Sequence, residues 1–171
     1  AREDVDAAIR AILSELGSAA RVYLGDQTLE ALWPAIWREH GGFNALSEVL
    51  TRWADGNAKP LVLLIDEIDA LIGDTLIAVL RQLRAGYAKR PWLFPQSVVL
   101  CGVRDVRDYR IHSSRSQEII TGGSAFNIKA RSLRMDDFDR AEVQSLYAQH
   151  TAETGQPFEA AALELIWELT Q

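Results

Sequence analysis

The stretch of sequence that decides the fold is "KPLVLLIDEIDALIGD", Lys59 to Asp74. Five consecutive large aliphatic residues, Leu61 to Ile65, run directly into Asp66 and Glu67. An apolar run of this length is too short for a buried helix and is typical of a strand covered on both faces. We therefore expect a buried strand that ends at two neighbouring carboxylates.

A second strand of the same kind is expected at "SVVLCG", Ser97 to Gly102, which contains the only cysteine, Cys101, as a buried thiol. The segment between the two strands is predicted to be a helix with Asp74 as its N-cap. A strand, a helix and a second strand form a crossover unit, so the two strands should be parallel. The expected fold class is therefore α/β. The apolar residues that repeat at helical spacing between the strands are Leu76, Ile77, Leu80 and Leu83.

The segments before the first strand are predicted to be helical. Apolar residues from Val5 to Leu16 repeat at helical spacing, and Gly17 stands where that helix should stop. The segment from Thr28 to Gly56 predicts further helix that is broken or kinked near Pro34 and interrupted at Gly41-Gly42. These helices are expected to pack on the sheet.

The segments after the second strand are less regular. A polar stretch from Ile111 to Ser124 is expected to be mostly loop, and "AFNIKA", Ala125 to Ala130, alternates as a third strand would. Asp139 and Glu142 have the spacing of a capping box, which predicts a helix that closes at Gly155. A last helix is expected from about Glu159 to the end of the sequence.

The carboxylates after the first strand have two interpretations. Ligands of open parallel sheets bind beyond the carboxyl ends of the strands, where Asp66 and Glu67 fall. Asp66 can hold Mg²⁺, which prefers oxygen ligands, and Glu67 can orient and deprotonate a water that attacks a phosphate. Alternatively, Asp66 or Asp69 caps the next helix and Glu67 is merely solvated. The buried run before the acids favours a site, with Asp69 as a cap or support.

Composition limits the classes of function. The chain has 171 residues, 48% of them hydrophobic, which is enough for one domain with a core. A net charge of −6 argues against a surface that coats nucleic acid. No apolar run approaches the ~20 residues of a membrane helix, so no membrane contact is expected. A single cysteine fits a reducing compartment, and the cytoplasm is the expected location.

The stretch "LVLLIDEIDAL" resembles the Walker B motif of the AAA and related P-loop ATPases. The resemblance implies that Asp66 coordinates the Mg²⁺ of a bound ATP and that Glu67 is the catalytic glutamate. "SVVLCGVRD" resembles the sensor strand that follows Walker B in these proteins. It implies that Arg104 contacts the γ-phosphate or the attacking water.

The resemblance also implies a division of the chain. "FNIKARSLRMDDFDRAEVQSLYAQHTAETGQPFEAAALELIWELT" is similar to the last core strand and the start of the small helical lid of AAA-like ATPases. Residues 1–131 would then be a partial core of the P-loop NTPase type, with a parallel sheet and flanking helices. Residues 132–171 would be the beginning of the C-terminal lid.

The phosphate-binding half of such a site is missing from the sequence. A P-loop needs G-x-x-x-x-G-K-[ST], and none of the three lysines, Lys59, Lys89 and Lys129, lies in such a motif. We therefore expect a fragment of an AAA-like ATPase that lacks its first strand. The parent protein would bind and hydrolyse Mg-ATP, and the isolated chain would do little of either. The incomplete sheet would favour self-association or a protein partner.

Three alternatives stay open. Arg107, Arg110 and Arg115 are either arginine fingers of the ATPase class or a solvated turn paired with nearby aspartates. The run Asp66 to Asp69, "DEID", also matches the box of a DExD helicase, although the acidic composition provides no groove for a nucleic-acid strand. The third alternative is an interaction module that has an ATPase-like fold without catalysis.

Overall fold

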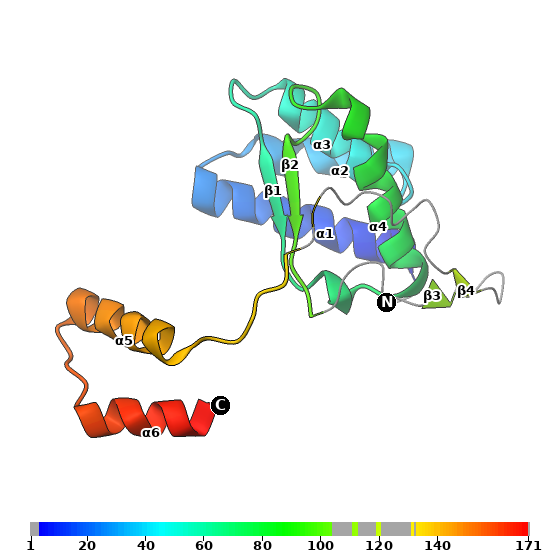
Figure 1. Ribbon diagram of the computed structural model, residues 1–171. Coiled ribbons are helices and arrows are strands. Elements are labelled where there is room, and N and C mark those ends of the chain that lie inside the picture. The colour runs from blue at the N-terminus through cyan, green and yellow to red at the C-terminus, as the bar shows by residue number, and fades with distance from the viewer. Residues whose placement is uncertain (1–3, 104–110, 113–118, 121–130, 132, 171) are drawn as a thin grey trace. The chain divides into compact units, whose positions relative to one another are not determined.

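The computed structural model of the protein describes residues 4–103, 111–112, 119–120, 131 and 133–170, and its helices and strands are shown in Figure 1. The chain divides into two compact units, Ala1–Ala130 and Arg131–Gln171. The elements of the first unit are α1 (Val5–Ala19), the π-helix η1 (Ala20–Leu24), α2 (Thr28–His40), α3 (Ala45–Asp55), β1 (Val62–Ile65), the 3₁₀-helix η2 (Ile68–Ala70), α4 (Gly73–Ala85), the 3₁₀-helix η3 (Tyr87–Lys89), β2 (Ser97–Leu100), β3 (Ile111–His112) and β4 (Ile119–Ile120).

Helix α1 confirms the helix predicted near the start of the chain, but the expected end at Gly17 is wrong. The side chain of Asp4 caps the helix by accepting a hydrogen bond from the backbone N–H of Ala7 (3.1 Å). The helix continues through Gly17, whose missing side chain lets α1 approach Glu30 of α2: a Cβ on Gly17 would lie 3.3 Å from the Cα of Glu30. The helical path ends only at Gly25, which has the left-handed φ of 67°.

Helix α2 runs through Pro34, so a break at that residue is wrong and the alternative of a kink stays a prediction, whereas the predicted interruption at Gly41-Gly42 is confirmed. Proline removes one N–H donor from a helix and usually kinks it. Here the buried residues Leu29 and Ile36, 0% and 1% exposed, anchor the helix on both sides of the proline. Packing of the apolar face therefore outweighs the local preference, and α2 ends at Gly41, where φ is 64°.

Helices α1, α2, α3 and α4 build most of the core of the first unit. Helix α3 confirms its predicted apolar face, and each of these helices contacts at least one of the others. Phe94, from the loop before β2, is fully buried in the same core. Other large side chains with less than 2% exposure are Ile9, Leu13, Leu29, Ile36, Leu46, Val49, Leu50, Ile68, Leu76, Leu80 and Leu83.

Strands β1 and β2 are parallel, as predicted, and α4 is the helix that connects them. The register pairs Leu63 with Val98 and Ile65 with Leu100. The expected role of Asp74 as N-cap is wrong, because Ile72 occupies that position and Asp74 lies inside the first turn of α4.

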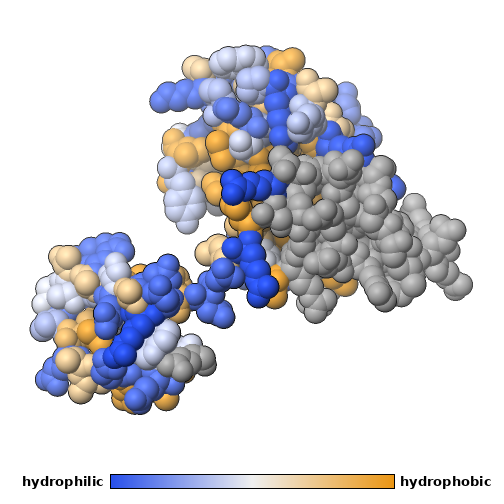
Figure 2. Space-filling model, in the orientation of Figure 1, coloured by the Kyte–Doolittle hydropathy of each residue, from blue (hydrophilic) through white to orange (hydrophobic). Residues whose placement is uncertain are grey.

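Among the described residues, only one face of the β1–β2 pair is covered, so the prediction of a strand buried on both faces is wrong. On the covered face, Leu63 is 5% exposed and Ile65 packs against the core. On the other face, Val62, Leu64 and Val99 are 57%, 70% and 43% exposed. Figure 2 shows hydrophobic residues at the surface of the first unit where Figure 1 places the two strands. The strands therefore form a surface layer on a helical core.

The predicted α/β fold class with a P-loop NTPase-type core is also wrong. The structure is mostly helical, and the parallel sheet in the described part of the chain has only two strands. The segment expected to be mostly loop contributes the short antiparallel pair β3–β4, in which Ile111 lies opposite Ile120. The third strand predicted at Ala125 to Ala130 lies outside the described residues. Helix packing, and not a central sheet, organises this unit.

The second unit consists of α5 (Arg140–Thr154) and α6 (Ala160–Thr170). The predicted capping box is confirmed: Asp139 accepts from the N–H of Glu142 (2.8 Å), and Glu142 accepts from the N–H of Asp139 (2.9 Å). Helix α5 closes at Gly155 in the left-handed conformation, as expected. The rings of Tyr147 and Phe158 pack edge to face with centroids 4.8 Å apart.

Candidate functional site

The site expected from the sequence lies where β1 ends beside β2. The hydrogen-bonded pairing of the strands continues past their ends, because the N–H of Cys101 donates to the carbonyl of Ile65 (2.8 Å). The N–H of Ile68 in turn donates to the carbonyl of Cys101 (3.0 Å). Asp66 and Glu67 lie between these two bonds and are both exposed. Both carboxylates therefore lie at the surface, on a loop that two backbone hydrogen bonds to Cys101 hold beside the end of β2.

Asp66 is oriented by its neighbour. Its Oδ1 accepts a hydrogen bond from the backbone N–H of Glu67 (2.8 Å). Side chains alternate between the two faces of a strand, so Asp66 continues the exposed face of Val62 and Leu64. One of its two oxygens is thereby held by the backbone. The other oxygen has lone pairs available for a cation or a water.

Glu67 adopts a backbone conformation that is rare for its residue type. Its φ of 51° and ψ of 39° lie in the left-handed region, and no other described non-glycine residue has a positive φ. Such a conformation costs about 1–2 kcal/mol for a residue with a Cβ. The next residue, Ile68, is 1% exposed and holds the loop to β2 through the bond to Cys101. Burial of Ile68 therefore maintains the strain at Glu67.

Asp69 is held against the end of β2. A Cβ on Gly102 would lie 2.9 Å from the Oδ1 of Asp69 and 3.1 Å from the Cγ2 of Ile68. Glycine at position 102 therefore lets the turn after β1 lie directly on the turn after β2. Asp69 lies in η2, and no side chain caps that helix. Its expected role as a cap is wrong, whereas a supporting role fits the contact.

The donor set suits Mg²⁺ better than it suits ATP. Magnesium is usually bound by one or two carboxylates together with substrate phosphates and water, and Asp66 meets that requirement. No group of three acidic, histidine or cysteine residues in the described ranges is arranged to hold a metal by itself. Lys59 lies before β1, at the opposite end of the strand from Asp66, and Lys89 bonds to Thr51. Neither is placed to neutralise phosphates at Asp66.

The position of Arg104 relative to Asp66 and Glu67 is not described, because Arg104 lies outside the described residues. The same holds for the alternative arginine fingers Arg107, Arg110 and Arg115. Their predicted roles stay predictions. The residue before this gap, Val103, is 88% exposed.

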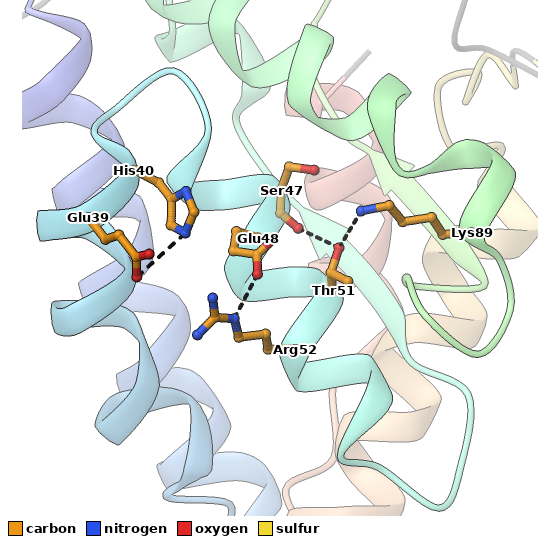
Figure 3. Close-up of polar contacts among 7 residues, drawn as sticks. All are labelled: Glu39, His40, Ser47, Glu48, Thr51, Arg52 and Lys89. Atoms are coloured by element: carbon orange, nitrogen blue, oxygen red, sulfur yellow. Dashed lines mark hydrogen bonds and ion pairs between the residues drawn. The ribbon is translucent and has the colours of Figure 1, made fainter.

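A second group of polar residues lies around α3 and is shown in Figure 3. The Nζ of Lys89 donates to the Oγ1 of Thr51 (3.3 Å), which itself donates to the carbonyl of Ser47 (2.8 Å). Arg52 and Glu48 form an i,i+4 ion pair at 2.7 Å. The ion pair lies on the surface of α3, and the bond from Lys89 attaches η3 to α3, so these contacts stabilise the fold.

One feature was not anticipated from the sequence. A hollow of about 650 Å³ lies along α1 and α2 and is lined by Asp4, Asp6, Arg10, Trp33 and Trp37, among others. The guanidinium of Arg10 lies 5.3 Å from the centroid of the Trp37 ring. The i,i+4 spacing of the two tryptophans was the available signal, but the same spacing is typical of a core-facing stripe.

Comparison with known proteins adds no relative: no family model, curated protein or solved structure matches the chain. Among the described helices, none is both long and apolar enough to span a membrane.

Proposed function

We propose that this chain supplies the carboxylate half of an ATP-hydrolysing site of the AAA-like class. The observation that carries the proposal is the pair Asp66 and Glu67, exposed at the carboxyl end of β1 and fastened to the end of β2. The proposal rests on this site and on the resemblance of its sequence to Walker B. It does not rest on the fold, since one fold hosts many functions and one chemistry recurs on several folds.

The two acids have different roles. Asp66 provides an oxygen ligand for Mg²⁺, which reaches the protein together with the phosphates of ATP and supplies electrostatic stabilisation there. Glu67 accepts the proton of the attacking water and orients it. The left-handed backbone of Glu67 supports this assignment, because strained residues concentrate at functional sites.

Residues outside this sequence must bind the phosphates, because the chain contains no G-x-x-x-x-G-K-[ST] motif. The activity therefore belongs to a larger protein or assembly, and the chain alone hydrolyses little ATP. We place this activity in the cytoplasm, since one cysteine in 171 residues fits a reducing compartment.

Metal binding tests the role of Asp66 without requiring turnover. Paramagnetic Mn²⁺ added to the labelled chain should broaden the backbone amide signals of residues 65–70 and of Gly102. Asp66→Asn should abolish this broadening, because it removes the ionised ligand. Asp55→Asn, an exposed carboxylate at the end of α3, is the matched control and should change nothing. Equal broadening in Asp66→Asn would contradict the proposed role.

Measurement of ATP turnover tests whether the phosphate-binding half of the site lies outside this sequence. Purified chain mixed with Mg-ATP should release phosphate no faster than Glu67→Gln does. If the chain released phosphate at the rate of an intact ATPase, at about 1 s⁻¹ or faster, then phosphate binding by residues outside the sequence would be refuted.

A protein-interaction module is the second candidate, and one observation favours it. The exposed apolar face of Val62, Leu64 and Val99 is a surface of the kind that partners cover. The two candidates differ in the Mn²⁺ experiment, since an interaction module needs no metal at Asp66.

A further inference from the structure

The exposed face of the β1–β2 pair is an unusual surface for a parallel sheet. We call it the open sheet face; it consists of Val62 and Leu64 of β1 and of Ser97 and Val99 of β2. The register places Leu64 beside Val99 and Val62 beside Ser97, so all four side chains share one face. Three of the four are aliphatic and at least 43% exposed.

Parallel sheets are almost always covered on both faces, whereas the described part of the chain covers this one on a single face. The helical core packs against Leu63, Ile65, Val98 and Leu100. Burial of the opposite aliphatic face would lower the free energy, because its apolar surface would be removed from water. A cover for this face is therefore favourable.

We propose that the open sheet face of one chain stacks on the same face of a second copy, with the strands of the two copies antiparallel. A two-fold axis perpendicular to the strands, between the two sheets, generates this arrangement. Stacked sheets lie ~10 Å apart, with the side chains of the facing strands interdigitating. Leu64 and Val99 of each copy are then buried in the contact.

Charge at the two ends of β1 selects this orientation. Lys59, exposed, precedes the strand, and Asp66 and Glu67, also exposed, follow it. In an antiparallel stack the Lys59 end of each copy lies over the Asp66–Glu67 end of the other. Lysine and glutamate side chains together span a separation of ~10 Å between sheets. A parallel stack would instead place like charges over one another at both ends, which is unfavourable.

The area of the face sets the strength of the association. Three partly exposed side chains provide much less than the ~800 Å² that each partner of a stable complex buries. The dimer is therefore weak and depends on protein concentration. Because opposite charges contribute, part of its affinity should be lost at high salt.

Sedimentation equilibrium of the full chain over a wide range of concentrations tests the face. The wild-type chain should associate reversibly to a dimer and not to larger species, since a two-fold contact is closed. Leu64→Lys and Val99→Lys should each abolish association, because a charge would be buried in the contact. Leu24→Lys is the matched control: Leu24 is 67% exposed on η1, close to the 70% of Leu64, and its substitution should leave association intact.

The two face variants also separate stacking from pairing at the edge of the sheet. Edge pairing through β1 would be sensitive to Leu64→Lys and insensitive to Val99→Lys, which lies on β2. That result would overturn the proposal. Circular dichroism of each variant should match the wild type, as expected for substitutions at exposed positions.

Charge reversal tests the antiparallel orientation. Lys59→Glu alone and Glu67→Lys alone should each weaken self-association about tenfold, since two attractive pairs per dimer become repulsive. A mixture of the two variants should form a heterodimer as strong as the wild-type dimer, because each charge then meets its opposite. A parallel stack instead predicts that neither single variant associates more weakly than the wild type, because like charges already face one another there, and that the mixed dimer is stronger than the wild-type dimer.

The association can be tested separately from the proposed function, although Asp66 and Glu67 take part in both. Leu64→Gln removes the aliphatic side chain without adding a charge beside Asp66, so association should be lost in this variant while Mn²⁺ broadening persists. A wild-type chain that stays monomeric at every concentration, or a face that binds only a helix of a different protein, would overturn the self-association proposal and leave the carboxylate site untouched.

Discussion

The ring of Phe94 lies directly on the Cα of Gly86, where any side chain at position 86 would occupy the same space. Phe94 is fully buried, and Gly86 ends α4. The close approach lets the loop after the crossover helix fold back and bring its aromatic ring into the core before β2 begins. The placement of β2 beside β1 therefore depends on a glycine that the sequence does not mark as special.

Gly86→Ala should destabilise the chain by about 2 kcal/mol or more, because the added methyl group overpacks a rigid buried ring. Gly56→Ala is the matched control, since Gly56 ends α3 with φ −79° and ψ −6°, against −81° and −8° at Gly86. A Cβ on Gly56 would lie 3.5 Å from its nearest neighbour, an ordinary contact. Urea denaturation should show no loss of stability for the control. Equal effects of the two substitutions would refute the packing argument.

Gln82 joins three segments of the helical core and should be sensitive to loss of its amide. It is 3% exposed; its Oε1 accepts from the N–H of Ser47 (3.2 Å), and its Nε2 donates to the carbonyl of Gly42 (2.9 Å). Gln82→Leu keeps the volume but leaves two buried backbone groups unpaired, at a cost of about 2–4 kcal/mol. Gln149→Leu, at an exposed position of α5, should change the free energy of unfolding little. A small effect at position 82 would show that water replaces the amide.

Acid should destabilise the first unit through Asp26. Hydrogen bonds from the indole of Trp53 (2.7 Å) and from Thr28 (2.8 Å) lower the pKa of Asp26 below its usual value near 3.8. The unfolded chain therefore binds this proton more readily than the folded one, so the contribution is present above about pH 4 and is lost as pH falls through the folded pKa. Asp26→Asn should flatten the fall in stability between about pH 5 and pH 2. An unchanged pH profile would contradict this role.

The sequence predicted the elements that have a strong local signal. The apolar periodicities of α1 and α3, the aliphatic runs of β1 and β2, and the capping box at Asp139 and Glu142 were all confirmed. Each depends on residues close together in the chain, where spacing and side-chain chemistry determine the outcome. The position of Asp66 and Glu67 directly after a strand was predicted from local sequence in the same way and is also confirmed.

The parts that the sequence did not predict depend on long-range packing. Nothing within Leu61 to Ile65 distinguishes a strand covered on two faces from one covered on one face, because that depends on which helices pack there. The same limitation explains Cys101, which was expected to be buried and is exposed just after β2. It also explains Pro34, where burial of α2 on both sides outweighs the local preference of proline.

The backbone of Glu67 gives the last prediction, which separates strain from chemistry. Glycine adopts φ near 51° without the steric cost that a Cβ imposes, so Glu67→Gly should stabilise the chain by about 0.5–1 kcal/mol despite the entropy of glycine. Glu67→Gln keeps the Cβ and should leave the free energy of unfolding nearly unchanged. Urea denaturation of the three proteins measures the difference. If Glu67→Gly is no more stable than Glu67→Gln, the strain is absent and no longer supports a functional role for this residue. If it is more stable, the chain carries a glutamate at a structural cost, as expected when the carboxylate is needed for chemistry.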